Sequence, residues 1–244
     1  DQRGCGRSKP FCEIKENTTQ DLVEDIEKVR IASGLGHRKV QLFGVSWGTF
    51  LSLSYAVKYP ENVTRIVLRS VFLCTKQEYR DVEGGEFVKK MFPDIYEEYI
   101  KGAKEPERAT AEYFDNILSC SLSNKNGLKY LKKVSDYENM LMSLNPNKKK
   151  LPRKLGVKDM CLARLEAHYF RNRCFVRDII SKVHKIRHIP VTIVHGRYDA
   201  VTPAYYAYEL HKVLPRSTIH FTVAGHMMTD EGNYNEIKKI FGGC

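Results

Sequence analysis

The stretch Leu42–Gly48, LFGVSWG, decides how this chain folds. It places Ser46 between two glycines, after an apolar run and before a segment typical of a helix. This pattern suits a sharp strand-to-helix turn that presents a serine hydroxyl to a cleft. Residues 39–43 predict a short buried strand, and residues 47–58 predict an apolar helix. The same pattern is also compatible with a glycine-rich turn that carries no chemistry, so the neighbouring segments must decide.

The segments around this turn alternate between helix and strand. Leu22, Ile26 and Val29 recur at helical spacing, which predicts an amphipathic helix over about 19–33, and residues 62–68 predict a second buried strand. Such alternation favours a parallel sheet with helices on both faces. The same pattern returns near the end of the sequence, with strands at 191–196 and 218–223 and helices at 203–213 and 233–241.

The middle of the chain has a different period. From about 75 to 185 the apolar residues follow helical spacing, and we predict helices over 96–99, 109–118, 127–143 and 155–170. Residues 145–150 read as the most exposed connector. We therefore expect a discontinuous α/β core, 1–74 and 186–244, and a helical cap domain over 75–185.

The charge of the chain is unevenly distributed. The formal net charge is +11, and residues 121–160 hold ten basic and three acidic residues. Such a stretch can bind nucleic acid or a membrane surface. We favour a solvated, lysine-rich face, because no nucleic-acid-binding motif accompanies it and no apolar run approaches the roughly 18 residues of a membrane span. We expect neither nucleic acid nor a membrane as a partner.

The seven cysteines form no CxxC pair and no Cys/His cluster at zinc spacing. An odd, scattered set in a chain of 244 residues favours free thiols in a reducing compartment. The sequence therefore predicts a cytoplasmic location and no metal site.

Three residues follow one another in a chemically meaningful order. Ser46 is followed by Asp199, in the turn after one predicted strand, and by His226, just after the next. This is the order of the α/β-hydrolase arrangement. A neutral imidazole must take the proton of the serine hydroxyl, and a carboxylate must hold that imidazole in the right tautomer. All three residues come at carboxyl ends of predicted parallel strands, where open α/β sheets place their sites.

Several blocks of the sequence resemble the proline iminopeptidases. They span almost the whole chain, and the resemblance implies an α/β-hydrolase fold with a helical cap. It implies removal of N-terminal proline from peptides without a metal or organic cofactor. The blocks are residues 1–8 (DQRGCGRS), 17–19 (NTT), 44–48 (GVSWG), 68–73 (LRSVFL), 166–170 (EAHYF) and 195–199 (HGRYD).

The resemblance assigns roles to residues of the proposed triad. It makes Ser46 the nucleophile, Asp199 the acid and His226 the base, with the acyl group carried on the serine. It also makes the backbone N–H of Trp47 one donor to the oxyanion.

The resemblance further assigns residues that bind substrate. It makes Glu166 a carboxylate that grips the free amino group of the peptide, with Glu138 as the second. Phe72 and Phe170 resemble walls of the proline pocket. Without the resemblance, Glu138 and Glu166 would be interpreted as solvated glutamates on helices.

The sequence departs from the family pattern in two places. The family carries a His-Gly-Gly-Pro-Gly loop before the block at residues 1–8, and this sequence lacks it. We therefore expect an N-terminally truncated chain whose first strands are missing. Residues 78–83 (EYRDVE) also lack the neighbouring aromatic residues that the family usually places along the pocket, so a preference for proline is less firmly implied than aminopeptidase chemistry.

Two other functions remain open at this point. The same fold and triad would serve an esterase or amidase of other specificity. A catalytically silent hydrolase-fold protein is the alternative outside enzymes. The sequence leaves the oligomeric state open.

Overall fold

The computed structural model describes residues 1–144 and 155–242. These residues form two compact units. The first, here called the cap unit, contains residues 1–22, 79–140 and the described part of 145–176. The second, the core unit, contains residues 23–78, 141–144 and the described part of 177–244. The expected connector at 145–150 lies outside the described residues.

A parallel sheet forms the centre of the core unit. Its strands are β1 (Val40–Val45), β2 (Val63–Arg69), β3 (Val191–Gly196) and β4 (Ser217–Thr222). They lie in the order β1-β2-β3-β4, and all three pairings are parallel. The carboxyl ends of all four strands therefore meet at one edge of the sheet.

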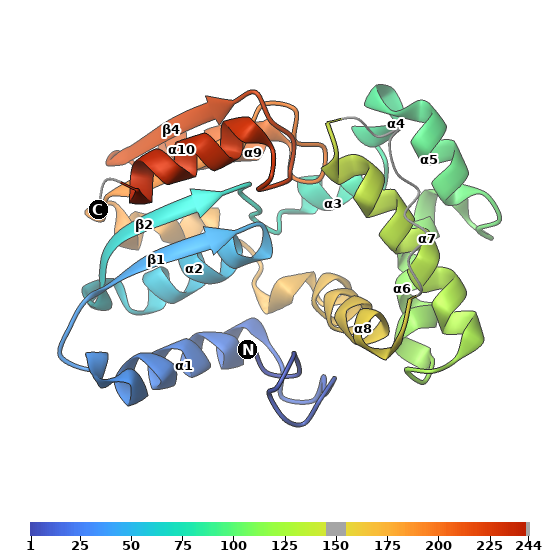
Figure 1. Ribbon diagram of the computed structural model, residues 1–244, viewed down its shortest axis with the longest axis horizontal. Coiled ribbons are helices and arrows are strands. Elements are labelled where there is room, and N and C mark those ends of the chain that lie inside the picture. Colours follow the sequence, from blue (N-terminus) through green and yellow to red (C-terminus); the bar gives the residue numbers. More distant parts are fainter. Residues whose placement is uncertain (145–154, 243–244) are drawn as a thin grey trace. The chain divides into compact units, whose positions relative to one another are not determined.

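Helices cover both faces of this sheet, as Figure 1 shows with α10 in front and α2 behind. α2 (Trp47–Lys58) packs against β1 and β2, while α9 (Ala204–Val213) packs against β3 and β4. Ile237 of α10 (Glu231–Phe241) packs on Val67 and Val194 of the two central strands. The predicted α/β architecture is thus confirmed.

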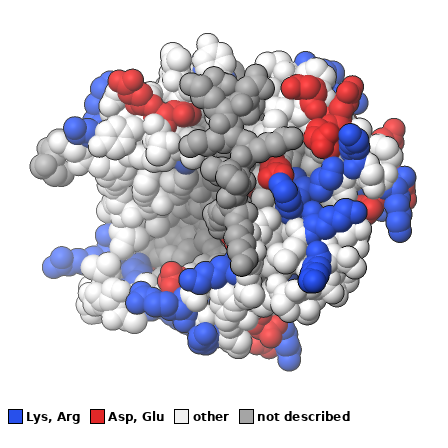
Figure 2. All heavy atoms as spheres, turned by 45° about the vertical axis from the view of Figure 1, so that its right-hand side comes forward, with Lys and Arg blue, Asp and Glu red and all other residues white. Residues whose placement is uncertain are grey.

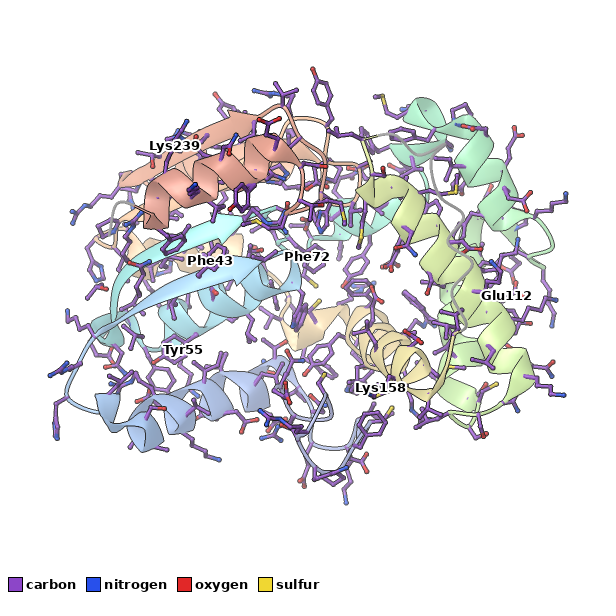
Figure 3. The ribbon with its side chains drawn as sticks, viewed as in Figure 1. Phe43, Tyr55, Phe72, Glu112, Lys158 and Lys239 are labelled. Atoms are coloured by element: carbon purple, nitrogen blue, oxygen red, sulfur yellow. The ribbon has the colours of Figure 1, made fainter. Side chains whose placement is uncertain are left out.

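The central strands are apolar because both of their faces are covered. In β2, residues 66–69 are all buried, and β3 is buried at every position except Thr192. β1 differs, because it has a partner on one side only among the described strands. Its side chains alternate in exposure, and Phe43 is 46% exposed where its ring meets Phe241 edge-on (Figure 3). The prediction that 39–43 is a buried strand was therefore wrong.

The helix that precedes the sheet is α1 (Thr19–Arg30), followed by a further helical turn over Ile31–Leu35. Gly34 has φ +74°, which ends the regular helix close to the predicted boundary. Glu27 of α1 accepts a hydrogen bond of 2.7 Å from the hydroxyl of Tyr55, which α2 carries (Figure 3). This contact joins α1 to the helix layer behind the sheet.

All regular elements between β2 and β3 in the described residues are helical, in agreement with the sequence pattern. Within the cap unit α6 lies beside α8, and α4 beside α5. Sequence analysis missed α3 and α4, which are short, and the start of α5 at Pro93, a favourable first residue of a helix. The helices are α3 (Lys76–Val82), α4 (Val88–Met91), α5 (Pro93–Ile100), α6 (Ala109–Ser119), α7 (Lys125–Met142) and α8 (Val157–Arg171).

Two of the cysteines differ from the sequence-based prediction. Cys74 and Cys174 each take part in a disulfide bond, whereas Cys5, Cys12, Cys120 and Cys161 are free. The expectation that the cysteines are all free thiols was therefore wrong. A scattered spacing along the sequence does not report which sulfur atoms the fold brings within bonding distance.

The surface is charged but mixed in sign. Figure 2 shows Lys and Arg side chains interspersed with Asp and Glu over the face that it displays. On α7, the Lys132 ammonium pairs with Asp136 one turn away. Such pairing is typical of a solvated helix face. None of the helices in the described part of the chain has the length and apolar character needed to cross a membrane.

The turn at Gly44 gives a test of the fold. A Cβ at Gly44 would lie 2.4 Å from the carbonyl oxygen of Gly48, which is backbone and cannot rotate away. We expect Gly44→Ala to destabilise the protein by about 1–3 kcal/mol, as overpacked sites do. The measurement is the free energy of unfolding in urea.

Gly48→Ala is the matched control. A Cβ there meets nothing within 4 Å, and the position lies inside α2. Alanine favours a helix over glycine by about 1 kcal/mol, so this variant should be as stable as the wild type or more so. Equal destabilisation by both substitutions would contradict the close approach at Gly44.

Candidate active site

Ser46 lies at a strained turn between β1 and α2. Its backbone has φ +53° and ψ −122°, a conformation that residues with a side chain rarely adopt. The turn is held on both sides: Ser46 N–H donates to the carbonyl of Arg69 at 3.0 Å, and Thr49 N–H donates to the carbonyl of Ser46 at 2.8 Å. Such strain persists only where the surrounding structure enforces it, and it lifts the serine side chain out of both elements.

The imidazole of His226 joins Ser46 to Asp199. Its Nε2 lies 3.1 Å from Ser46 Oγ, and its Nδ1 lies 3.0 and 2.9 Å from the two carboxylate oxygens of Asp199. His226 and Asp199 are buried, at 5% and 2% exposure. The structure therefore brings the three predicted residues together within hydrogen-bonding distance, in the order serine, imidazole, carboxylate.

Asp199 is fixed by its own turn as well as by His226. Its carboxylate accepts hydrogen bonds from the backbone N–H of Val201 and Thr202, at 3.0 and 2.8 Å, and from the Thr202 hydroxyl at 2.9 Å. Burial alone would raise the pKa of Asp199, but the charge of His226 and these hydrogen bonds outweigh burial and hold the pKa at about 2. The carboxylate therefore stays ionised throughout the neutral range.

Two buried residues that the sequence did not single out for the site support it. His195 is fully buried, accepts the N–H of Val71 at Nδ1 and donates from Nε2 to the carbonyl of Thr202, 2.7 Å away. Because an N–H only donates and a carbonyl only accepts, these partners fix the neutral tautomer, and burial lowers the pKa of His195. His195 thus packs at the end of β3 and anchors the loop of Asp199.

Arg69 is the second supporting residue. It is 4% exposed, and its Nη1 donates to the carbonyl of His226 at 2.6 Å and to Ser70 Oγ at 2.9 Å. Burial lowers the pKa of Arg69, while Asp199 and Asp230 favour its charge. A cation at the end of a buried strand was a signal in the sequence, because a charged side chain inside an apolar run is rarely buried without a purpose.

The cap unit holds a separate group of carboxylates. Glu138 of α7 lies within hydrogen-bonding distance of Glu166 of α8, and the pKa of Glu166 is raised well above its ordinary value by burial first and by Glu138 second. Both predicted glutamates are therefore brought together. Glu166 is half-buried rather than solvated, so the alternative interpretation of two solvated helix residues fails for it.

A third glutamate, Glu83, belongs to the same group and was missed by sequence analysis. Burial, followed by the charge of Glu138, raises its pKa to about 8. Glu83 in turn raises the pKa of Glu166. Its sequence signal was weak, because it follows α3 in a Gly-Gly turn and has no periodic relation to the other two.

The remaining predicted residues divide between the two units. Trp47 is the first residue of α2, and its ring packs on Phe50, which also contacts Phe72. Phe72, labelled in Figure 3, lies in the segment between β2 and α3. Phe170 lies in the cap unit, where it packs on Tyr79 and Phe114. Trp47 and Phe72 therefore lie near Ser46 in the core unit, and Phe170 lies on the helix that carries Glu166.

The described residues contain no group of three His, Cys, Asp or Glu side chains placed to hold a metal ion. The chemistry that these side chains offer is proton transfer and nucleophilic attack in the core unit and cation binding in the cap unit.

Comparison with known proteins agrees with this geometry. Residues 1–233 match the family model described as the alpha/beta hydrolase fold. A solved alpha/beta fold family hydrolase from Bacillus anthracis str. Sterne aligns with a TM-score of 0.64 at 20% identity, covering 98% of this chain and 77% of the other. An esterase from Thermogutta terrifontis aligns with a TM-score of 0.58 at 16% identity, covering 100% and 76%. These structural matches establish the fold.

Curated relatives narrow the family. The proline iminopeptidase of Neisseria gonorrhoeae is 37% identical over 238 residues, covering 94% of this chain and 74% of its own length. The proline iminopeptidase of Arabidopsis thaliana is 36% identical over 244 residues, covering 95% and 62%. The predicted resemblance and fold class are confirmed: the chain belongs to the proline iminopeptidase family of α/β-hydrolases.

Proposed function

We propose that this chain is a serine aminopeptidase that releases N-terminal proline from peptides through an acyl-enzyme. The observation that carries the proposal is the pairing of Glu138 with Glu166 in a family whose curated relatives are proline iminopeptidases. A serine hydrolase of esters has no use for buried carboxylates that attract a cation, whereas an aminopeptidase must recognise a free ammonium group.

The proposed reaction begins at Ser46. Its Oγ bonds to the carbonyl carbon of the N-terminal residue while His226 Nε2 takes the hydroxyl proton. The C–N bond then breaks, the leaving amine receives that proton, and the prolyl group remains as an ester on Ser46. Water attacks this ester, His226 takes a proton from the water and returns it to Ser46, and proline leaves. Asp199 stabilises the imidazolium formed in both steps and keeps its tautomer.

The oxygen that becomes negative during attack needs donors. Trp47 begins α2, so the positive end of the helix dipole lies beside Ser46, which favours negative charge there. We assign the Trp47 backbone N–H as one oxyanion donor. An oxyanion donor typically contributes a factor of about 10² to 10³ in rate.

Specificity is assigned to the cap domain, which we take as residues 75–185. Glu138 and Glu166 bind the secondary ammonium group of the N-terminal proline, and Phe170, on the same helix as Glu166, contacts its ring. The amine and the carbonyl carbon of one residue are a fixed distance apart, so holding the amine selects the first peptide bond.

The disulfide-bonded Cys74 and Cys174 favour an oxidising compartment over the cytoplasm expected from the sequence.

The nucleophile is tested by covalent labelling. A serine-directed phosphonate should attach to Ser46, and Ser46→Ala should lower kcat for a proline arylamide by about 10⁴-fold or more, because triad members act as a unit. Intact-mass spectrometry detects the attached label, and peptide mapping identifies the residue that carries it. A label on another serine in an active preparation would overturn the assignment.

The amine site is tested by substrate and residue together. Glu166→Gln and Glu138→Gln should each lower kcat/KM for free proline arylamide roughly 10-fold or more, since a hydrogen bond to a charged group contributes about 1.5–3 kcal/mol. N-acetylproline arylamide lacks the positive charge, so neither the wild type nor Glu166→Gln nor Glu138→Gln should cleave it. The control is Glu97→Gln, which changes an exposed glutamate of α5. Equal cleavage of the acetylated and free substrates would point to the esterase or amidase alternative.

The buried carboxylates also predict how stability depends on pH. Their pKa values are raised above the unfolded value of about 4.5, to about 8 for Glu83, so the folded protein binds more protons between these values. Stability must therefore fall as pH rises from about 5 to 8, by at most about 1.4 kcal/mol per pH unit for each proton. Glu166→Gln should lessen this fall in urea unfolding experiments, and Glu97→Gln should not. An unchanged slope in Glu166→Gln would contradict the raised pKa of Glu166.

A further inference from the structure

The turn that carries Glu83 is held in place by three hydroxyl groups from three different helices. The carbonyl oxygens of the consecutive residues 82–84 each accept one hydrogen bond. The donors are the Tyr137 hydroxyl to Val82 at 2.8 Å, the Thr110 hydroxyl to Glu83 at 3.0 Å and the Tyr96 hydroxyl to Gly84 at 3.2 Å. Three tethers on three adjacent peptide groups fix the backbone of Glu83 relative to α5, α6 and α7.

The donors themselves are locked. The ring of Tyr99 stacks on Tyr137 with centroids 3.9 Å apart, and its hydroxyl lies 2.8 Å from the hydroxyl of Thr110. Gly85 has φ +72°, and a Cβ there would lie 2.1 Å from the ring of Tyr96. The turn is thus built around its glycine, and Glu83 cannot move away from its neighbours without breaking several buried contacts.

This placement brings three carboxylates close enough to affect one another's ionisation. Tyr137, which tethers the turn, is the neighbour in sequence of Glu138. Burial and the charge of Glu138 act on Glu83, and Glu83 and Glu138 both act on Glu166. Glu83 and Glu166 nevertheless keep some solvent-exposed surface, so they are not sealed inside the cap unit.

The charged and titratable groups that face Glu83 come from three helices. Arg171 is the cation among them, and it already donates to both carboxylate oxygens of Asp115, at 2.7 and 3.1 Å. Its effect on Glu83 is smaller than that of burial or of Glu138. The facing groups are Tyr99 of α5, Tyr137 and Glu138 of α7, and Glu166 and Arg171 of α8.

Counting charges decides the role of Glu83. Three ionised carboxylates beside one another and without a cation would repel, which is costly in a partly desolvated site. A proton on one carboxyl group removes part of that repulsion in the empty site. A bound prolyl ammonium group supplies a positive charge beside all three groups, which lowers their pKa values and favours release of that proton.

We propose that Glu83 is a third member of the ammonium-binding cluster: an uncharged carboxylic acid in the empty site that releases its proton to solvent when the substrate's ammonium group binds. This inference rests on the proposed function of Glu138 and Glu166. It makes recognition of the N-terminal amine depend on pH through a residue that contacts neither the scissile bond nor the triad.

The consequence is measurable as proton linkage. If binding of a cation releases one proton, the affinity rises about 10-fold for each unit of pH over the range where Glu83 is protonated before binding. A neutral amide at position 83 cannot release a proton, so Glu83→Gln removes this dependence.

The experiment uses L-prolinamide as the probe and Ser46→Ala as the background, so that no turnover occurs. Titration calorimetry at pH 6.5 and 7.5, in two buffers of different ionisation enthalpy, gives the number of protons released. We expect release from Ser46→Ala and a number lower by at least half a proton in Ser46→Ala/Glu83→Gln. Between pH 6.5 and 7.5, the affinity for L-prolinamide should rise several-fold in Ser46→Ala and much less in Ser46→Ala/Glu83→Gln.

Two variants serve as controls. Glu86→Gln changes an exposed glutamate of the same turn and should leave the proton count unchanged. Glu83→Asp keeps a carboxyl group and should restore release, which a merely structural role of Glu83 would not require. Thermal unfolding verifies that each variant is folded.

The outcomes separate the two proposals. Binding without proton release in Ser46→Ala, or equal release with and without Glu83→Gln, overturns the role of Glu83 and leaves Glu138 and Glu166 in place. Failure of Glu166→Gln to weaken prolinamide binding, together with cleavage of acetylated substrate, overturns the amine site and the role of Glu83 with it.

Discussion

The imidazole of His226 has to keep two partners at once, and the core unit is built to meet that requirement. Its Nδ1 contacts Asp199 and its Nε2 contacts Ser46, so the ring can neither rotate nor shift without losing one of them. The three residues are far apart in the sequence and come together only because parallel strands end at the same edge of the sheet. Strand register therefore sets the geometry of these three residues.

The loops beyond the strand ends are then fixed by close backbone packing. A Cβ at Gly196 would lie 2.2 Å from the carbonyl oxygen of Gly225, so the end of β3 and the segment before His226 lie in direct contact. Arg69 holds the carbonyl of His226, and His195 holds that of Thr202. Both side chains are buried and each is held by two hydrogen bonds, which is how a site retains its geometry without relying on flexible loops.

The periodicity of apolar residues and the order of the polar residues along the chain were sufficient to predict the strands and the residues that follow them. The sequence placed Ser46, Asp199 and His226 at strand ends, because strands and turns have local signatures. It could not reveal Glu83, whose position depends on the Thr110 hydroxyl, 27 residues away, and on the Tyr137 hydroxyl, which binds the carbonyl of Val82 from 55 residues away. Nor could it show that Gly44 is needed for space whereas Gly48 is not, since that difference arises from one close contact between backbone atoms.

The cap unit keeps its carboxylates at a cost to folding. Glu83 and Glu166 resist ionisation, so each opposes the stability of the empty protein as pH rises, and a well-packed apolar residue would be less costly. A proline side chain by itself offers only an apolar ring, which many peptides could match. The free ammonium group distinguishes a chain terminus from an internal residue. In the function proposed above, carboxylates that are unfavourable alone and relieved by one cation convert that single charge into selectivity, because an acylated amine leaves their repulsion in place.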